Sequence, residues 1–145
     1  MKNLPYRFFA FALFVSPIAG FAQTSESADE IVSIGLNALR KIDTGETESL
    51  WDNTSAFVKT QMPKDTFVSG ISSSRSRYGS ITKRTWAGVM RIQYPQGSVS
   101  PPEGLYANAD FSSTLANGQV IFEKVTMRFE PDGWRVVGYV PRDVQ

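Results

Sequence analysis

Residues 105–130 read LYANADFSSTLANGQVIFEKVTMRFE, and this stretch decides the fold. Apolar and polar residues alternate over 105–114 and again over 120–130, a period typical of strands whose two faces meet different surroundings. Asn117-Gly118 between them is a signal for a tight hairpin turn. The stretch therefore predicts two antiparallel strands joined by a short turn.

Two further strands are expected on either side of this hairpin. Residues 81–92 are long enough for one bent strand, and Gly88 inside them is typical of a bulge. Residues 93–104 are rich in Pro, Gly and Ser and predict a loop. A turn containing Gly133 then leads into a last strand over 134–140. The sequence thus predicts an antiparallel meander of four strands.

Three helices are expected before the strands. Ser27 and Glu30 form a capping box at the start of the first, because the two side chains satisfy each other's free amides. A second helix is expected over 50–58, and Pro63 is suited to the first turn of a third, which Gly79 closes. Helices segregated from strands predict an α+β domain with the helices packed on one face of the sheet.

The N-terminus has the pattern of a secretory signal. Two bases precede an apolar run over residues 8–15, which is too short to span a membrane. The small residues Gly20 and Ala22 then suit cleavage before Gln23. We therefore expect residues 1–22 to be a signal peptide that sends the chain to the periplasm or out of the cell. Because no cysteine follows the apolar run, no lipid anchor is expected there.

The expected mature chain, residues 23–145, is interpreted as a single domain with its core over about 28–140. It has no cysteine and no histidine, which excludes disulfides, thiol nucleophiles, histidine-based triads, and thiolate or histidine metal sites. Loss of Lys2 and Arg7 reduces fifteen bases to thirteen, against fourteen acids, so no general attraction to nucleic acid is expected. No cofactor and no metal site is expected.

Five short motifs follow one another along the chain. They are Asp43-Thr44-Gly45 with Trp51, Arg75 with Gly79 and Arg84, Pro102-Glu103-Gly104-Leu105-Tyr106, Glu123-Lys124-Val125-Thr126, and Asp132-Gly133-Trp134-Arg135-Val136-Val137-Gly138-Tyr139. In order and spacing they resemble a bacterial family, the domain of unknown function 4019. The resemblance covers about 31–140 and departs at Phe67, Leu115 and Gly118, where a tryptophan, an aromatic residue and a lysine are expected.

The resemblance implies a fold similar to nuclear transport factor 2. In that fold a strongly curved antiparallel sheet makes a cone, and three N-terminal helices cover its concave side. Such scaffolds host isomerases, dehydratases, binding modules and assembly partners, so the resemblance implies no single activity.

Three charged residues are expected to point to the interior. Glu123 shares a strand side with four apolar residues, Arg84 shares one with Trp86, and Arg75 lies on the apolar stripe of the third helix. Because an unpaired buried charge is very costly, these groups should find one another.

Two interpretations of these charges stay open. In the first they form a polar pocket, in which Arg75 and Arg84 bind an anionic group, Glu123 orients them, and Tyr106 and Tyr139 line the mouth. In the second they form a buried network that fixes the third helix against the sheet. Four further residues are interpreted as structural: Trp51, Trp134, Gly79 and Gly133.

The function expected from the sequence is that of an exported soluble binding or interaction module of the cell envelope, with a small ligand or an envelope protein as its partner. One alternative is a small isomerase-like or hydrolase-like enzyme that uses Glu123 or Asp110 as a base. Another is a purely structural partner in an envelope complex. A homodimer is also considered, through the outer side of the third strand, where Val120 and Phe122 alternate with polar residues.

Overall fold

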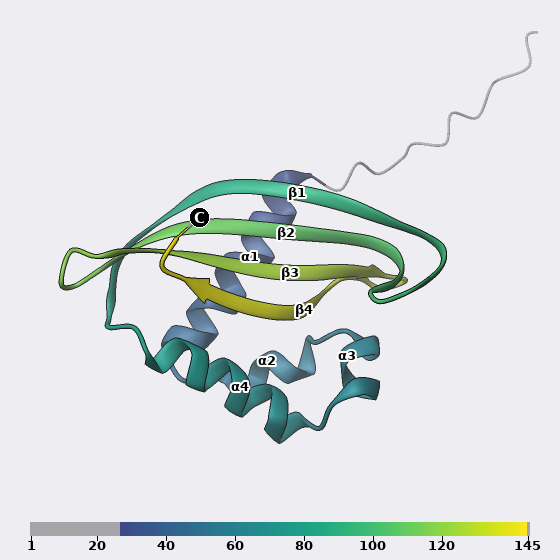
Figure 1. Cartoon of the computed structure of the whole chain (residues 1–145), viewed down its shortest axis with the longest axis horizontal. Coiled ribbons are helices and arrows are strands. Elements are labelled where there is room, and N and C mark those ends of the chain that lie inside the picture. The colour runs from purple at the N-terminus through teal and green to yellow at the C-terminus, as the bar shows by residue number, and fades with distance from the viewer. Residues whose placement is uncertain (1–26, 145) are drawn as a thin grey trace, which may run out of the picture.

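The computed structural model describes residues 27–144, so the expected signal peptide lies outside the described residues. Its helices and strands, in chain order, are α1 (Ala28–Asp43), α2 (Thr47–Asp52), α3 (Ala56–Gln61), α4 (Lys64–Ser76), β1 (Ile81–Val99), β2 (Pro102–Leu115), β3 (Val120–Glu130) and β4 (Gly133–Arg142). The strands form one antiparallel sheet in the order β1-β2-β3-β4, the predicted meander (Figure 1). The α+β prediction is therefore confirmed.

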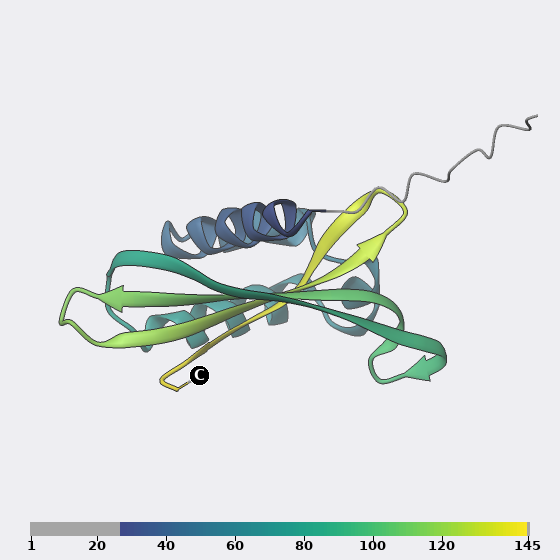
Figure 2. The ribbon, with the colours of Figure 1, turned by 90° about the horizontal axis from the view of Figure 1, so that it is seen from above.

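Among the helices that the structure describes, only α1 crosses the face of the sheet. The helices α2, α3 and α4 lie beyond β4, along that side of the sheet (Figure 1). The sheet is twisted but not strongly curled, so the expected cone does not form (Figure 2). The bulges, at Thr82 and Ala87 of β1 and Val137 of β4, lie on the two outer strands, while β2 and β3 pair without a break. No bend therefore runs across the whole sheet.

The second expected helix, over 50–58, is two short helices, α2 and α3. Between them the backbone pairs with β4, because Ser55 N donates to Val136 O at 2.8 Å and Val136 N donates to Asn53 O at 3.2 Å. Pairing of this kind needs extended backbone, which interrupts the helical pattern. The prediction of three helices is wrong for this reason, because residues 27–144 form four.

The expected loop over 93–104 is also wrong, because β1 and β2 continue as a long hairpin to a turn at Ser100 and Pro101. Pro95 is tolerated inside β1 because it follows Tyr94 in an irregular segment that has no partner in β2, so the missing N–H interrupts no pairing. By contrast, the strand predicted over 120–130 coincides with β3.

The core lies between α1 and one face of the sheet. Alternate residues of β2 and β3 are buried on this face: Ala107, Ala109, Phe111, Leu115, Ile121, Val125 and Met127. The helix approaches closely at Gly35, where an added Cβ would lie 3.0 Å from the ring of Phe111. Of the structural aromatic residues, Trp134 is buried beside Phe129, and Trp51 packs on Phe67 with 5.4 Å between ring centroids.

None of the described helices has the length and apolar character needed to cross a membrane.

Candidate functional site

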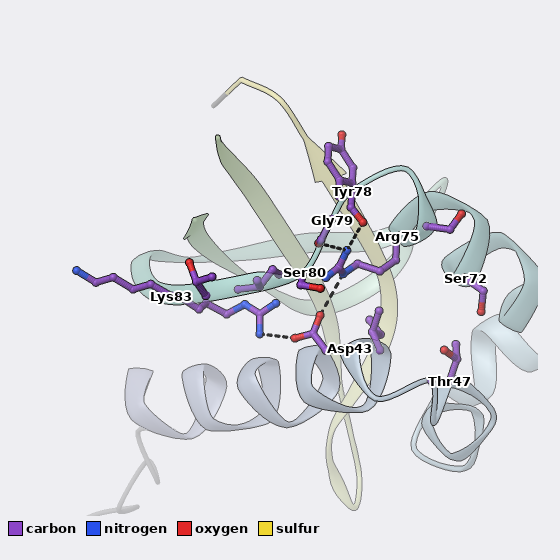
Figure 3. A pocket seen from close by; sticks show the side chains of 14 residues that line it. Asp43, Thr47, Ser72, Arg75, Tyr78, Gly79, Ser80 and Lys83 are labelled. Atoms are coloured by element: carbon purple, nitrogen blue, oxygen red, sulfur yellow. Dashed lines mark hydrogen bonds and ion pairs between the residues drawn. The ribbon is translucent and has the colours of Figure 1, made fainter. Parts of the chain in front are cut away.

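A cleft of about 700 Å³ opens where the end of α1, the end of α4 and the start of β1 meet (Figure 3). Three bases and one acid line it: Arg75, Lys83, Arg84 and Asp43. Hydroxyl groups make up much of the remaining wall, from Thr47, Ser72, Ser76, Tyr78, Ser80 and Thr82. The cleft is therefore polar, and bases outnumber acids on its surface.

Asp43, the last residue of α1, joins the two arginines. Its Oδ1 accepts from Arg75 Nε at 3.0 Å, and its Oδ2 accepts from Arg84 Nη1 at 2.9 Å (Figure 3). One carboxylate thus holds α1, α4 and β1 together through two charge-assisted hydrogen bonds.

Arg75 also stabilises the turn that follows α4. Its Nη1 donates to the carbonyl oxygens of Tyr78 at 3.0 Å and Gly79 at 3.1 Å, as Figure 3 shows. The guanidinium thus supplies a donor to two backbone carbonyls that lie beyond the end of α4, where no helical N–H is available to them. Its Nη2 has no hydrogen-bond partner among residues 27–144 and is not shut off from solvent, so one donor of Arg75 stays available.

Arg84 of β1 reaches over Ser113 of β2 to Glu123 of β3. Its Nε lies 3.1 Å from Ser113 Oγ and 2.9 Å from Glu123 Oε2. Burial acts to lower the pKa of Arg84, but hydrogen bonding to Asp43 and the charges of both carboxylates outweigh it, so the pKa is raised. Arg84 is therefore a permanent cation at the base of the cleft.

Glu123 is wholly buried and lies at the inner end of the network. Its Oε2 also accepts from the hydroxyl of Ser113, and its Oε1 accepts from Tyr139 OH at 2.8 Å. Burial, together with the adjacent Glu123 carboxylate, raises the pKa of Tyr139 well above its ordinary value. Both oxygens of Glu123 are thus occupied by donors of the protein itself.

The structure brings together four of the five residues considered for a polar pocket, in a different arrangement from the one expected. Arg84 contacts Glu123, and Tyr139 contacts Glu123 from β4. Arg75 reaches the network only through Asp43, which sequence reasoning did not select. Asp43 follows Ile42, the last buried residue of α1, so the spacing of apolar residues does not indicate which way its side chain points. The sequence indicates a role for Asp43 only through its place in the first motif.

Tyr106 does not belong to this cleft. It lies on β2 seven positions from Ser113, about 23 Å along the strand at the usual rise. Its side chain is on the face of the sheet opposite α1, where its ring contacts Tyr94 with centroids 5.2 Å apart. The expectation that Tyr106 lines the mouth of the pocket is wrong because it alternates with the inward residues of β2.

Asp110, the other carboxylate considered as a base, also lies on the outer face of the sheet. It accepts from Arg142 Nη2 at 2.9 Å and has no access to the cleft. Across residues 27–144, no cluster of acidic side chains has the arrangement to hold a metal ion.

A family model described as "Protein of unknown function (DUF4019)" matches residues 35–139. No curated protein and no solved structure matches the chain. The matched segment contains the whole network, from Asp43 to Tyr139, together with the strands that carry it.

Proposed function

The chain belongs to the DUF4019 family, as its motifs predict, and from this premise we propose that it is a non-enzymatic binding module whose cleft takes a small anion with carboxylate or phosphate groups. The family description assigns no activity, so the support comes from the cleft. A carboxylate or phosphate group has the chemistry that arginine, lysine and hydroxyl side chains recognise.

The observation that carries the proposal is the surplus of positive charge at the cleft. Arg75, Arg84 and Lys83 contribute three positive charges, while Asp43 and the underlying Glu123 contribute two negative charges. Lys83 has no ion-pair partner among residues 27–144 and is exposed. Its side chain extends away from Arg75 (Figure 3), so the donor in the cleft that the protein does not already use is Nη2 of Arg75.

The geometry argues for binding rather than proton transfer. A general base needs a free lone pair within reach of a substrate, but Glu123 is wholly buried and accepts from Arg84, Ser113 and Tyr139. The raised pKa of Tyr139 makes it a poor acid at neutral pH. Glu123 and Tyr139 are therefore poorly suited to acid–base catalysis, which supports the binding proposal.

A purely structural role is the second candidate. It is favoured by one observation, namely that Arg84 donates to three protein groups, Asp43, Ser113 and Glu123. In this role the network would fasten β1 and α4 to α1 without any ligand. Anion binding distinguishes the two candidates, because a structural network needs none.

The place of action proposed is the periplasm or the extracellular space, after removal of residues 1–22. A homodimer through the outer sheet face also stays a prediction. None of these points is needed for the binding proposal.

The test is calorimetric titration of the purified protein with acetate, succinate, citrate and inorganic phosphate, each against sodium chloride of the same ionic strength. We expect at least one of them to bind, and Arg75→Met to weaken that binding by about tenfold through loss of a charged donor. The matched control is Lys64→Met, which removes the same charge from the far end of α4. If none of the four anions binds better than chloride, or if both variants bind alike, the proposal is wrong.

A further inference from the structure

The two edges of the sheet differ in how they are covered. The outer edge of β4 is bridged at Val136 by the segment between α2 and α3. At the opposite edge, β1 pairs with β2 alone among the described strands (Figure 1). An outer strand of this kind presents backbone N–H and C=O groups that can pair with another chain.

One part of β1 has the regularity that an added strand requires. Residues 88–94 pair with β2 in seven consecutive positions, from Gly88 with Asp110 to Tyr94 with Gly104, without a shift of register. A bulge at Ala87 and an irregular segment after Tyr94 bound this stretch on its two sides. The stretch reads GVMRIQY, and its β-branched, aromatic and long apolar residues suit extended pairing.

Large apolar side chains stand exposed on both faces of this edge. Met90 is 58% exposed on the outer face of the sheet. Trp86, beside the bulge, is 53% exposed and shares the inner face with its neighbour Phe111. A strand placed next to β1 would cover apolar surface that the protein leaves in water.

The charge of β1 indicates the kind of strand that fits. None of its nineteen residues is acidic, and it carries Lys83, Arg84 and Arg91. Arg84 is neutralised by Asp43 and Glu123, but Arg91 is exposed and has no ion-pair partner among residues 27–144. A second copy of β1 would place bases beside bases, which is unfavourable across neighbouring strands.

We propose that residues 88–94 of β1 are a docking edge for an extended acidic segment of a partner protein, which adds to the sheet as a fifth strand. Backbone hydrogen bonds supply the pairing, and Arg91 selects acidic side chains at neighbouring positions. The cleft does not reach this stretch, since on β1 its lining ends at Arg84, so either proposal can fail without the other.

The probe is a fluorescein-labelled synthetic peptide of about eight residues in which valine alternates with glutamate. Its binding to the purified protein is followed by fluorescence anisotropy. Two peptides serve as comparisons: one carries lysine in place of glutamate, and the other keeps the glutamates but has alternate backbone nitrogens methylated. We expect each change to weaken binding by about tenfold or more, because the first reverses the charge and the second removes strand hydrogen bonds.

The variant that tests the position is Arg91→Glu, and Lys124→Glu is its matched control. Both change the net charge by the same amount, but Lys124 lies on β3, separated from the β1 edge by β2. We expect Arg91→Glu to weaken binding of the acidic peptide by about tenfold and Lys124→Glu to change it by less than about twofold.

Amide hydrogen exchange provides the structural readout. We expect the bound acidic peptide to slow the exchange of amides within residues 88–94 and to leave those of β4 unchanged. The proposal is overturned if the acidic peptide does not bind, if the methylated peptide binds equally well, or if Lys124→Glu weakens binding as much as Arg91→Glu. It is also overturned if the protein alone protects these amides increasingly with its concentration, since the occupant is then a second copy.

Discussion

Arg84 and Glu123 form an ion pair across an intervening strand. Arg84 Nε lies 2.9 Å from Glu123 Oε2, although β2 runs between β1 and β3. Ser113 of β2 lies under this contact and donates its hydroxyl to the same carboxylate oxygen. The outermost strand β1 is therefore attached to β3 by an ion pair, in addition to the backbone hydrogen bonds that join each of them to β2. The contribution of this ion pair to the free energy of unfolding can be measured.

Replacing Glu123 by glutamine should lower the free energy of unfolding by about 3 kcal/mol, because Arg84 then keeps a largely buried charge with one partner fewer. Urea denaturation measures this change. The control is Glu48→Gln, which breaks an exposed pair with Lys64 and should cost less than about 1 kcal/mol. Equal losses for the two variants would contradict a buried network.

Replacing Asp43 by asparagine should cost about 1–2 kcal/mol, because two charge-assisted hydrogen bonds are weakened. The loss is expected to be smaller than for Glu123, since Asp43 is partly exposed and water can replace it. A double-mutant cycle with Arg75→Gln should give a coupling energy of about 1 kcal/mol. Strictly additive effects would show that Arg75 is not stabilised through Asp43.

Tyr139 should make the protein sensitive to alkali. Its pKa in the folded protein is raised, mainly by burial and then by Glu123, so the unfolded chain loses this proton first as the pH rises. The associated stability is fully present below the unfolded pKa of about 10 and decreases above it, by up to about 1.4 kcal/mol per pH unit. Urea unfolding between about pH 8 and 11 should give a shallower decline for Tyr139→Phe. Parallel declines would remove Tyr139 as the cause.

Two glycines in helices should respond oppositely to alanine. At Gly35 the new Cβ would lie 3.0 Å from Phe111 and 3.2 Å from the Cβ of Ala109, so we expect a loss of about 1–3 kcal/mol through overpacking. At Gly70 of α4 nothing lies within 4 Å, and alanine should stabilise by about 0.5–1 kcal/mol through its helix propensity. Thermal or urea unfolding gives both values, and a neutral Gly35→Ala would mean that α1 can move away from the sheet at no cost.

The export proposal is tested by the mass of the protein recovered outside the cytoplasm of a bacterial host. We expect a chain that begins at Gln23. Ala22→Phe should block cleavage, because signal processing needs a small residue there, and the precursor should accumulate. Recovery of the uncut chain in the cytoplasm, with either residue at position 22, would refute the proposal.

Sequence reasoning predicted the strands best where their surroundings alternate regularly. The strand over 120–130 is an example, since each inward residue of β3 from Ile121 to Met127 is buried. The helix over 50–58 was mispredicted because its polar middle pairs with Val136, a contact far along the chain that local periodicity does not encode.

In the candidate site too, the residues that alternation of strand faces determines were predicted, and the others were not. Arg84 and Glu123 lie on inward strand faces, so alternation places them correctly. Asp43 was missed because it lies at the end of a helix, where neither face is defined by further apolar residues. Tyr106 was misplaced because a motif groups residues by sequence, whereas the two faces of a strand separate them.

The close approach of Gly35 to Phe111 also bears on the order in which the chain folds. The helix α1 is synthesised first, but the ring against which it packs belongs to β2, most of the way along the chain. Within the sheet, in contrast, each strand pairs with its neighbours in sequence, so each hairpin can form as soon as it is complete. Until β2 and β3 are present, the apolar stripe of α1 stays in water, and during this interval the nascent chain is most exposed to aggregation and to capture by chaperones.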